Sequence, residues 1–417
     1  MSDQHCSHET WLSRLSNHLE KERYTAGTAR RCVNVSRHFL TYLSKQGVEV
    51  CEAQPANVER YLQQARRRYR RDRGHSGGYK GWRRSHTNGI HMLLRLVQGK
   101  WPPVLEASTP TEIFRREVCE EYASWITGFC GLAQETMSHR CAEAGRFLDW
   151  LGEERATRSE LVVLTSLDVD AFMKDRAASL RRRSLKGVAT NMRNFLGWLH
   201  STERTPHDLS STVIAPSLYA FESIPSALRA EDVKKVLTVT QQDRTPKGLR
   251  DCAILLLLST YGVRAGEITT LRLDDVDWRK EVIRICHHKT GATSYLPLLP
   301  EVGEAMLQYL QKSRPKTSLR EIFIRCCAPH RPFKNGSGLY PLVRRRIDAA
   351  GVITTGKRGP HAFRHARAVS LLRARVPVKE IGDLLGHRSA NSTLIYLKLA
   401  TEDLRAVAME IPTEVKA

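Results

Sequence analysis

Apolar residues in the first half of the chain recur at the three- and four-residue spacing of amphipathic helices, and this pattern repeats. Three segments recur in the same order. The first is TARRCVNVSRHFLTYL (28–43), which matches TMSHRCAEAGRFLDWL (136–151) at a constant offset. The others are ANVERYL (56–62), which matches LDVDAFM (167–173), and TNGIHMLLRLV (87–97), which matches TNMRNFLGWLH (190–200). The five positions that keep the first offset are Thr28, Phe39, Leu40, Tyr42 and Leu43, answered by Thr136, Phe147, Leu148, Trp150 and Leu151. Chance similarity between amphipathic helices explains a constant offset poorly. We therefore predict two copies of one helical unit, at residues 1–110 and 111–203.

The first copy carries an insertion rich in arginine and glycine, ARRRYRRDRGHSGGYKGWRR (65–84). Its glycines favour a mobile loop, and its arginines, with Tyr79 and Trp82, suit contacts with a DNA backbone or groove. A solvated charged loop is the structural alternative. We expect a loop that contacts DNA.

The pattern changes after residue 203. Residues 204–226 are rich in Ser, Thr and Pro, and the prolines interrupt any continuous helix, which predicts a linker. Beyond the linker, helical patterns alternate with short β patterns, and this mixture predicts a mixed α+β domain over 227–417. The expected helices are 230–237 and 249–262, and the expected strands lie within 275–278, 281–288 and 294–298.

The composition is that of a soluble protein with real hydrophobic cores. Hydrophobic residues make up 41% of the chain, and the mean hydropathy is −0.40. No stretch approaches the roughly 20 apolar residues that a membrane span needs. The first residues, Met1 to Leu12, lack the apolar core of a signal peptide, so we expect a cytoplasmic protein.

Cysteine and histidine usage indicates neither disulfides nor a metal site. The ten cysteines show no CxxC spacing, which is typical of free thiols in a reducing compartment. His287 and His288 form the obvious metal-binding pair, but neighbours in a strand point to opposite faces and cannot easily share one ion. We predict no metal.

Charge changes this picture most. The chain has 66 Lys and Arg against 44 Asp and Glu, a net charge of +22, and the excess is spread along its length. Such a surface attracts a polyanion, and nucleic acid is the leading candidate because neutralised phosphates release counterions. A membrane surface is the weaker alternative, since no lipidation motif is visible.

Four short motifs carry candidate chemistry. YGVRAGEI (261–268) places Arg264 just after a buried helix, where its planar fork could hold a phosphate, with Glu267 three residues later. HHKTGATSYLPL (287–298) presents Lys289 at a hairpin tip. Read singly, each has a bland alternative: a surface ion pair for the first and a solvated lysine for the second.

The other two motifs lie nearer the C-terminus. GPHAFRHA (359–366) puts His361 and Arg364 on one helical face, where they could bracket a single group. KEIGDLLGHRSANSTLIYLKL (379–399) ends one helix at LLGH and places Tyr396 on the next, nine residues after His387. Taken alone, a histidine is more often structural and a helical tyrosine more often packs.

Together, the order Arg…Lys…His-x-x-Arg…His…Tyr, with GVRAGE and LLGH in their settings, resembles the tyrosine recombinase (phage integrase) family. The resemblance implies that the six catalytic residues are Arg264, Lys289, His361, Arg364, His387 and Tyr396. It also implies a site-specific recombinase that joins DNA through a 3′-phosphotyrosyl link. Glu267 stands at the family's usual acidic position and supports the site structurally.

The resemblance assigns a role to each residue. Tyr396 is the nucleophile, and Arg264 and Arg364 stabilise charge on the phosphate. His361 is a general base or a phosphate-oxygen donor, an alternative that the sequence leaves open. Lys289 is the candidate general acid, and His387 hydrogen-bonds the scissile phosphate. No cofactor is expected, because the covalent intermediate conserves bond energy.

Each helical copy resembles the SAM-like core-binding domain that precedes the catalytic domain in this family, where one such domain is usual. The implied fold is multidomain: two all-α SAM-like DNA-binding domains, then a mixed α+β catalytic domain, closing round double-stranded DNA as a clamp. The implied assembly is a homo-tetramer on paired recombination sites, with related recombinases as further partners. Integration, excision or transposition of a mobile element is the expected role. A type IB topoisomerase and a non-catalytic DNA-binding protein are the alternatives.

Overall fold

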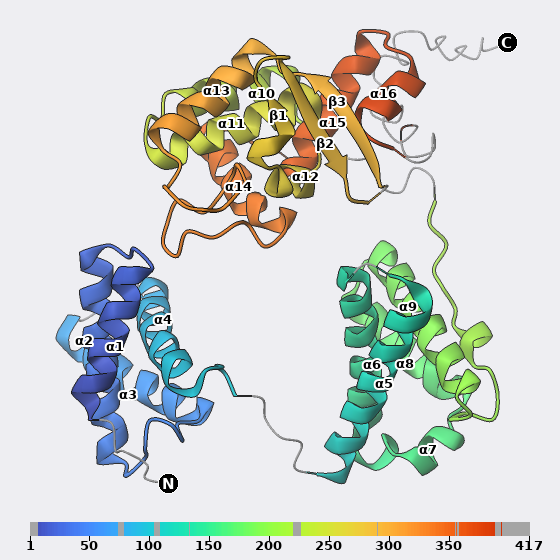
Figure 1. Cartoon of the computed structure of the whole chain (residues 1–417). Helices are drawn as coiled ribbons and strands as arrows, with labels where there is room; N and C mark the ends of the chain where they lie inside the picture. Colours follow the sequence, from blue (N-terminus) through green and yellow to red (C-terminus); the bar gives the residue numbers. More distant parts are fainter. Residues whose placement is uncertain are drawn as a thin grey trace, which may run out of the picture. The chain divides into compact units, whose positions relative to one another are not determined.

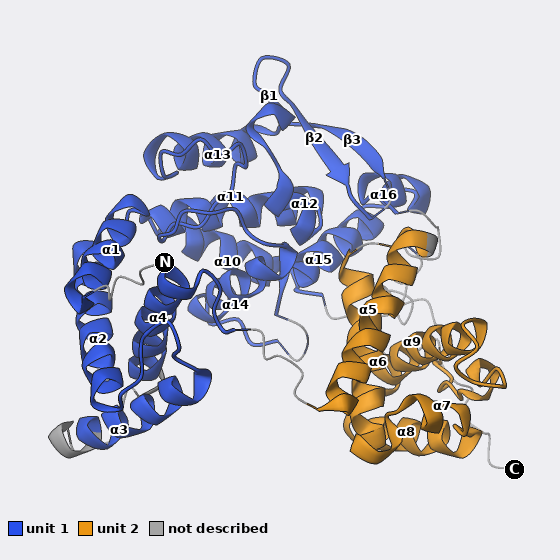
Figure 2. Cartoon of the chain, turned by 60° about the horizontal axis from the view of Figure 1, so that its bottom comes forward, with its two compact units in different colours: residues 1–103, 223–417 blue, residues 104–222 orange. Residues whose placement is uncertain are grey.

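The computed structural model describes residues 7–73, 79–103, 109–132, 134–219, 227–289, 291–354, 356, 358–387 and 393, without the side chains of 70–73, 79–80 and 129. The described chain is largely helical and contains one small sheet (Figure 1). It divides into two compact units, residues 1–103 with 223–417 and residues 104–222 (Figure 2). Three large hydrophobic clusters are present, one in each expected helical copy and one after residue 227. The three domain boundaries drawn from the sequence stay predictions.

The first helical set contains α1 (His8–Lys21), α2 (Ala26–Lys45), α3 (Pro55–Arg73) and α4 (Tyr79–Gln98). Side-chain oxygens of Ser7 and Thr25 cap the first two helices by accepting from backbone N–H groups one turn on. Apolar residues at helical spacing, such as Leu15, Leu19 and Phe39, are fully buried between the helices. The amphipathic pattern therefore reports the buried faces correctly.

The prediction of a loop at residues 65–84 was wrong for most of the segment. We expected a loop, but residues 65–73 continue α3 and residues 79–84 begin α4, and only 74–78 lie outside the described residues. Arginine, glutamine and alanine are good helix formers, so an arginine-rich stretch extends a helix that has already started. The expected helix-breaking glycines are confined to the region of 74–78 and to Gly81 inside α4.

The second helical set packs around its own core. It contains α5 (Pro110–Cys130), α6 (Gln134–Arg155), α7 (Arg158–Val162), α8 (Ser166–Ser179), α9 (Arg182–Ser201) and the 3₁₀ turn η1 (Ser210–Thr212). The expected linker from residue 204 is not free of this core, because Leu209 and Val213 are buried in it and Arg193 donates to the Val213 carbonyl at 2.8 Å. Two apolar residues in a polar stretch are enough to dock it.

Matching aromatic residues pack alike in the two sets. Phe39 stacks on Tyr42 with ring centroids 6.4 Å apart, and Phe147 stacks on Trp150 at 6.3 Å. A ring from another helix meets each phenylalanine edge-on: Tyr61 of α3 at 5.3 Å in the first set, and Phe172 of α8 at 5.1 Å in the second. Edge-to-face and offset contacts of this kind are favourable for aromatic rings.

The last part of the described chain is mixed α+β. Its helices are α10 (Ala230–Gln241), α11 (Pro246–Tyr261), α12 (Ala265–Thr270), α13 (Pro300–Lys312), α14 (Tyr340–Ala349), α15 (Pro360–Arg373) and α16 (Val378–Leu384), with 3₁₀ turns η2 (Leu273–Asp275) and η3 (Gly336–Leu339). Its strands are β1 (Val276–Asp277), β2 (Val282–His287) and β3 (Ala292–Pro297). The strands form an antiparallel sheet in the order β1-β2-β3, in which Ile283 pairs with Leu296 and His287 with Ala292.

Helix α11 is the central element of this part. Its residues 253–258 are all buried, as expected from its unbroken apolar run, and α10, α13 and α15 pack against it. Tyr261, at its C-terminal end, donates to the Pro297 carbonyl at 2.6 Å and accepts from the Leu299 N–H at 3.0 Å. The end of α11 is thereby tied to the end of β3.

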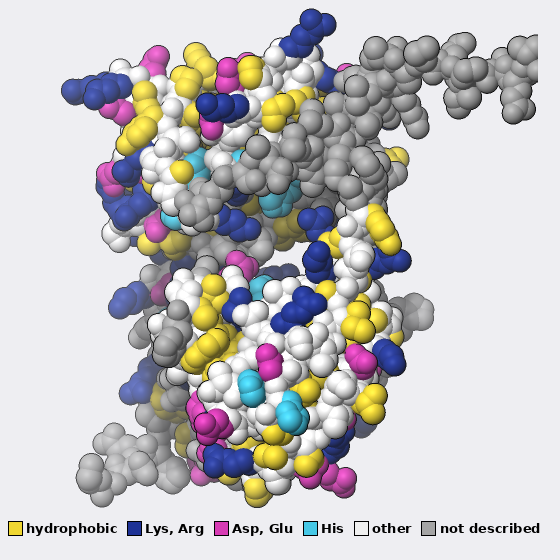
Figure 3. All heavy atoms as spheres, turned by 90° about the vertical axis from the view of Figure 1, so that its right-hand side faces the viewer, with side chains coloured by type: hydrophobic (Ala, Val, Ile, Leu, Met, Phe, Trp, Pro, Cys, Tyr) yellow, Lys and Arg dark blue, Asp and Glu magenta, His cyan; other side chains and the backbone are white. Residues whose placement is uncertain are grey.

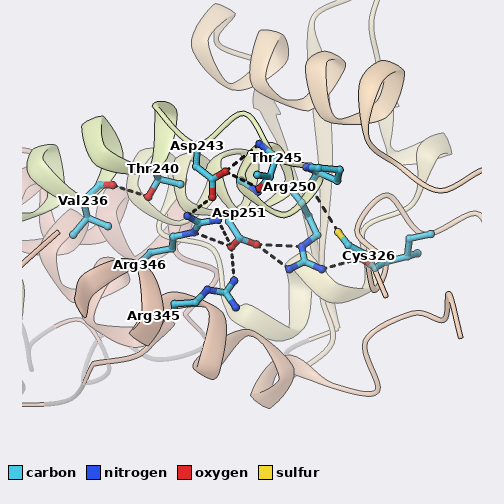
Figure 4. Close-up of polar contacts among 12 residues, drawn as sticks. Val236, Thr240, Asp243, Thr245, Arg250, Asp251, Cys326, Arg345 and Arg346 are labelled. Carbon is cyan, nitrogen blue, oxygen red and sulfur yellow. Dashed lines mark hydrogen bonds and ion pairs between the residues drawn. The ribbon is translucent and has the colours of Figure 1, made fainter. Parts of the chain in front are cut away.

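A buried ionic network fixes the other end of α11. Asp251 is fully buried and accepts hydrogen bonds from Arg250, Arg345 and Arg346, which Figure 4 shows pointing toward it. Arg346 also donates to Asp243 at 2.7 Å, just before α11. Since a buried carboxylate is costly unless it is paired, these contacts hold α14 in register against α11.

The surface of the described residues agrees with the charge of the sequence. On the face drawn in Figure 3, Lys and Arg side chains form several separate groups among polar and apolar ones. Among the described helices, none is both long and apolar enough to cross a bilayer.

Candidate active site

A glycine turn positions the first candidate arginine. Gly262 ends α11 with φ +65°, a left-handed conformation that favours glycine, and a Cβ there would lie 2.8 Å from Leu385. The Gly262 carbonyl accepts from Arg364 Nη1 at 2.7 Å. Two residues later, Arg264 is the N-cap of α12. Arg264 and Arg364 are about a hundred residues apart in sequence. The C-terminal end of α11 thus brings them to one place.

Glu267 holds Arg264 in place. Its carboxylate accepts from the Arg264 backbone N–H at 2.6 Å and from Arg264 Nη1 at 2.8 Å. Burial by itself would raise the pKa of Glu267, but the hydrogen bonds from His287 and Arg264 lower it below its ordinary value. A negative charge therefore stays beside the arginine, which supports the structural role expected of Glu267.

His287 is a contributor to this cluster that the sequence did not identify. Its ring is 1% exposed, with Nδ1 2.7 Å from Glu267 Oε1 and Nε2 2.9 Å from Ser294 Oγ on the paired strand. The alternation along β2 contained the signal, because His287 lies on the same buried face as Ile283 and Ile285. A buried histidine needs hydrogen-bonding partners, and here one of them is the carboxylate beside Arg264.

The LLGH segment lies against both arginines. Arg264 Nη2 donates to the Gly386 carbonyl at 3.0 Å, and Arg364 Nη2 donates to the Leu385 carbonyl at 2.6 Å. Gly386 has φ +62°, and a Cβ on it would lie 2.6 Å from the His287 ring. The close approach of this backbone to His287 therefore requires glycine.

His387 follows this turn, near both guanidinium groups. Its Nδ1 lies 2.7 Å from Thr393 Oγ1, and Thr393 is itself buried. Burial, followed by the positive charges of Arg364 and Arg264, lowers the pKa of His387 to about 4. The imidazole is thus neutral at physiological pH and can act as a hydrogen-bond partner without adding charge.

The remaining candidates are placed differently. Lys289 is exposed in the turn between β2 and β3, two residues before Gly291, which has φ +72°. His361 is exposed in the first turn of α15, one turn before the buried Arg364, and its ring lies 6.1 Å from that of His365. Tyr396 lies outside the described residues. The described contacts thus gather Arg264, Arg364 and His387, while Lys289 and His361 lie at exposed positions.

The chemistry of this cluster is that of an anion site. Two guanidinium groups are fixed by carbonyl and carboxylate acceptors, so they need little reorganisation when a charged group arrives. Among the described residues, no group of three or more His, Cys, Asp or Glu side chains is placed to hold a metal ion. The described guanidinium groups of Arg264 and Arg364 supply positive charge at this cluster.

Comparison of the sequence with known proteins shows the family of the chain. Residues 226–403, which include all six candidate residues, match the phage integrase family. The integrase/recombinase-like protein y4gC of Sinorhizobium fredii is 57% identical over 195 residues, which are 46% of this chain and all of that protein. The similarly named y4rF of the same organism is 32% identical over 292 residues, 70% of this chain and 68% of that protein.

A solved structure shares the fold. The lambda integrase tetramer bound to a Holliday junction aligns with 74% of this chain and 86% of its own, with a TM-score of 0.52 and 16% sequence identity. At that identity the likeness concerns the fold alone. The family match and the two Sinorhizobium relatives carry the assignment: the chain belongs to the phage integrase family of tyrosine recombinases.

Proposed function

We propose that this protein is a site-specific DNA recombinase that cleaves and rejoins strands through a 3′-phosphotyrosyl intermediate on Tyr396. The observation that carries the proposal is the convergence of Arg264, Arg364 and His387 on one buried turn, within the segment that matches the integrase family. The role we propose is integration, excision or transposition of a mobile element.

The two arginines supply the electrostatic part of the mechanism. Attack on a phosphodiester adds negative charge to a group that is already anionic, and fixed guanidinium groups stabilise that charge. Arg364 is buried and bonded to two carbonyls, and Arg264 is bonded to Glu267 and Gly386, so both are already oriented. Donors that are oriented in advance stabilise the transition state more than mobile ones do, because no reorganisation accompanies the reaction.

The other residues handle protons and bonds. Tyr396 attacks phosphorus, and the bond between phosphorus and the 5′ oxygen breaks as the phosphotyrosyl bond forms. Lys289, on the exposed hairpin, donates a proton to the leaving 5′ oxygen, and His361 accepts the tyrosine proton or hydrogen-bonds a phosphate oxygen. His387, neutral at physiological pH, hydrogen-bonds the scissile phosphate. The reverse attack by a different 5′ hydroxyl rejoins the strand and needs no cofactor.

Double-stranded DNA is the proposed partner, and a homo-tetramer on paired sites is the proposed assembly. The net charge of +22 supports a polyanion partner. A tetramer bound to a Holliday junction is the state of the lambda integrase structure that shares the fold. We further propose that both helical sets act as SAM-like DNA-binding domains.

The decisive experiment replaces Tyr396 by Phe and uses a nicked substrate that traps the covalent adduct. The variant loses only a hydroxyl, so we expect DNA binding within about twofold of the wild type and no adduct on a denaturing gel. A covalent adduct that survives in the variant would remove Tyr396 as nucleophile.

Assays of the wild-type protein separate recombination from topoisomerase activity. A recombinase joins two paired sites into a recombinant product, whereas a topoisomerase relaxes a supercoiled plasmid without joining sites. We expect recombinant product from two copies of the natural site. Relaxation without recombinant product would instead support the topoisomerase.

A further inference from the structure

A hollow lies among α2, α3 and α4 of the first helical set, away in sequence from every candidate active-site residue. Its volume is about 380 Å³. Pockets for small molecules have about 300–1,000 Å³, so the hollow can hold one ligand of modest size. The buried Tyr61 and the partly buried Tyr42 and Trp82 line its interior, and the exposed Lys45 and Arg68 line its rim.

The interior of the hollow is made of flat rings. The Tyr42 and Tyr61 rings are 5.5 Å apart, and Trp82 lies 5.4 Å from Tyr69 and 4.2 Å from His86. Burial lowers the pKa of His86 below its ordinary value, so that this ring is neutral at physiological pH. Neutral aromatic faces favour a planar ligand that can stack on them.

The rim of the hollow carries positive charge only. The charged side chains that line it are Lys45 and Arg68, with the imidazole of His38 beside them, and no carboxylate is among the described lining residues. Arg83, on the same helix as Trp82, is paired with Glu59 at 2.9 Å and is not part of the lining. The lining therefore favours a ligand that has an anionic group next to a planar one.

The second helical set shows that the helical packing itself does not need this basic rim. At the offsets that relate Phe39 to Phe147 and Tyr61 to Phe172, three lining positions of the first set correspond to acidic residues in the second: Thr41 to Asp149, Lys45 to Glu153, and Gln64 to Asp175. Arg68 corresponds to Ser179, whereas His38 and Ala65 correspond to Arg146 and Arg176. The aromatic contacts are alike in both sets, so this packing does not itself require the basic side chains of Lys45 and Arg68.

We propose that this hollow binds a single unstacked nucleotide, with its base against the Trp82 and Tyr42 rings and its phosphate at Lys45 and Arg68. Aromatic faces accept any base, and Lys and Arg hold phosphate. A nucleotide of a DNA strand and a free nucleoside monophosphate share this chemistry. We take the DNA strand as the source, and in this one respect the proposal rests on the proposed function.

The test compares single strands that differ only in their bases. The full-length chain is titrated with a fluorescein-labelled octathymidylate, with an equally charged strand of eight abasic residues, and with thymidine monophosphate. Stacking of one base is expected to make the thymidylate strand bind about 5- to 150-fold more tightly than the abasic strand. Equal affinity for thymidine monophosphate and the strand would assign the hollow to a free nucleotide, which keeps the ligand class and changes its source.

Two matched pairs of variants locate the binding. Lys45→Glu places at the rim the glutamate that the second set has at the corresponding position, Glu153. Arg60→Glu makes the same charge change at an exposed position of α3 outside the hollow. We expect about tenfold weaker strand binding for Lys45→Glu than for Arg60→Glu. Trp82→Ala should bring the affinities for the thymidylate and abasic strands close together. Trp11→Ala, another partly buried tryptophan on the same core, should leave their ratio unchanged.

Several results would overturn the proposal. The first is equal affinity of the chain for the base-containing and the abasic strands. The second is an equal loss of strand affinity in Lys45→Glu and Arg60→Glu. A third is self-association that Lys45→Glu abolishes while strand binding stays unchanged, since the hollow would then receive a second copy of the chain. Trp82→Phe, which keeps a ring, should retain most of the base preference even if Trp82→Ala unfolds. None of these titrations involves strand cleavage, so failure of the recombinase assignment would show only in the Tyr396→Phe experiment.

Discussion

Arg264 and Arg364 have different surroundings within one site. Arg364 is 3% exposed and donates to the carbonyls of Gly262 and Leu385. The Arg264 side chain is 20% exposed and is held by Glu267 as well as by the Gly386 carbonyl. Arg264 is therefore the arginine that can be altered with less damage to the core, and it is the better one to test for a role in chemistry.

Replacing Arg264 by Lys should slow strand cleavage strongly. Lysine keeps the charge but loses the planar fork that can hold a phosphate and Glu267 together. We expect a fall of about 10²–10³-fold in the single-turnover cleavage rate, the range seen when one oriented donor is removed. Arg279→Lys, at an exposed residue after β1, is the control and should cleave like the wild type. A rate within a few-fold of the wild type would show that Arg264 does not act on the phosphate.

His387 predicts a specific dependence of stability on pH. The folded state lowers its pKa from 6.5 to about 4, so between these values the unfolded chain takes up a proton that the folded chain does not. Stability is therefore fully present above about pH 6.5 and is lost as pH falls toward 4.

The measurement is the free energy of unfolding of the wild type minus that of His387→Gln, obtained by urea titration from pH 8 to pH 4. Subtraction removes the acid sensitivity of all other groups. We expect a constant difference above pH 6.5 and a steady loss of wild-type stability relative to the variant below it. A flat difference across the range would mean that His387 titrates normally in the folded protein.

At the scale of elements, the site is built where helix ends and a strand meet. The C-terminal turn of α11, the start of α12, the inner face of β2 and the turn after α16 all contribute. The contact between Gly386 and the His287 ring joins the last two of these. Because a left-handed glycine and a close approach coincide there, this turn is where a small change should disturb the geometry most.

Gly386→Ala should destabilise the protein more than an alanine at a comparable turn. Both Gly386 (φ +62°) and Gly351 (φ +63°) are left-handed, but only at Gly386 would a Cβ meet another side chain, at 2.6 Å. The backbone conformation should cost about 1–2 kcal/mol in either variant. The clash with His287 should add about 1–3 kcal/mol in Gly386→Ala alone, as overpacking does. Urea unfolding of both variants gives the difference, and equal losses would mean that His287 can move aside freely.

At the scale of the whole molecule, basic residues are distributed along the chain rather than gathered in a tail, and we have proposed that both helical sets bind DNA. Each phosphate contact contributes about 0.9 to the slope of log affinity against log salt concentration. The number of contacts that each part supplies can therefore be measured without a structure of the complex.

Deleting residues 1–110 should flatten this slope and shorten the protected footprint if the first helical set grips DNA. Arg66, Arg67 and Arg68, on the described part of α3, should account for part of the change when replaced by Ala. Binding of one protomer to a half-site, measured from about 50 to 300 mM salt, gives the slope. An unchanged slope and footprint, together with failed assembly on a full site, would instead assign the first set to contacts between protomers.

The sequence by itself predicted most of the helices and strands and named the candidate residues. Helical spacing marked the buried faces of the helices, LLGH marked the end of a helix, and the order of the motifs named Arg264, Arg364 and His387 as candidates. These signals are local, because each depends on residues within one or two turns of the chain. Lys289, His361 and Tyr396, the last outside the described residues, were named in the same way, and all six catalytic assignments stay predictions from the motif order.

Only the tertiary structure decided which buried faces meet. The hydrogen bond between His287 and Glu267, the approach of Gly386 to His287 and the docking of Leu209 and Val213 all join residues far apart in sequence or in different elements. Periodicity shows that a side chain is buried but not what it is buried against, since that depends on how helices and strands pack across long separations. The same limit applied to residues 65–73, whose glycine-rich neighbours suggested a loop although the arginines prolong α3.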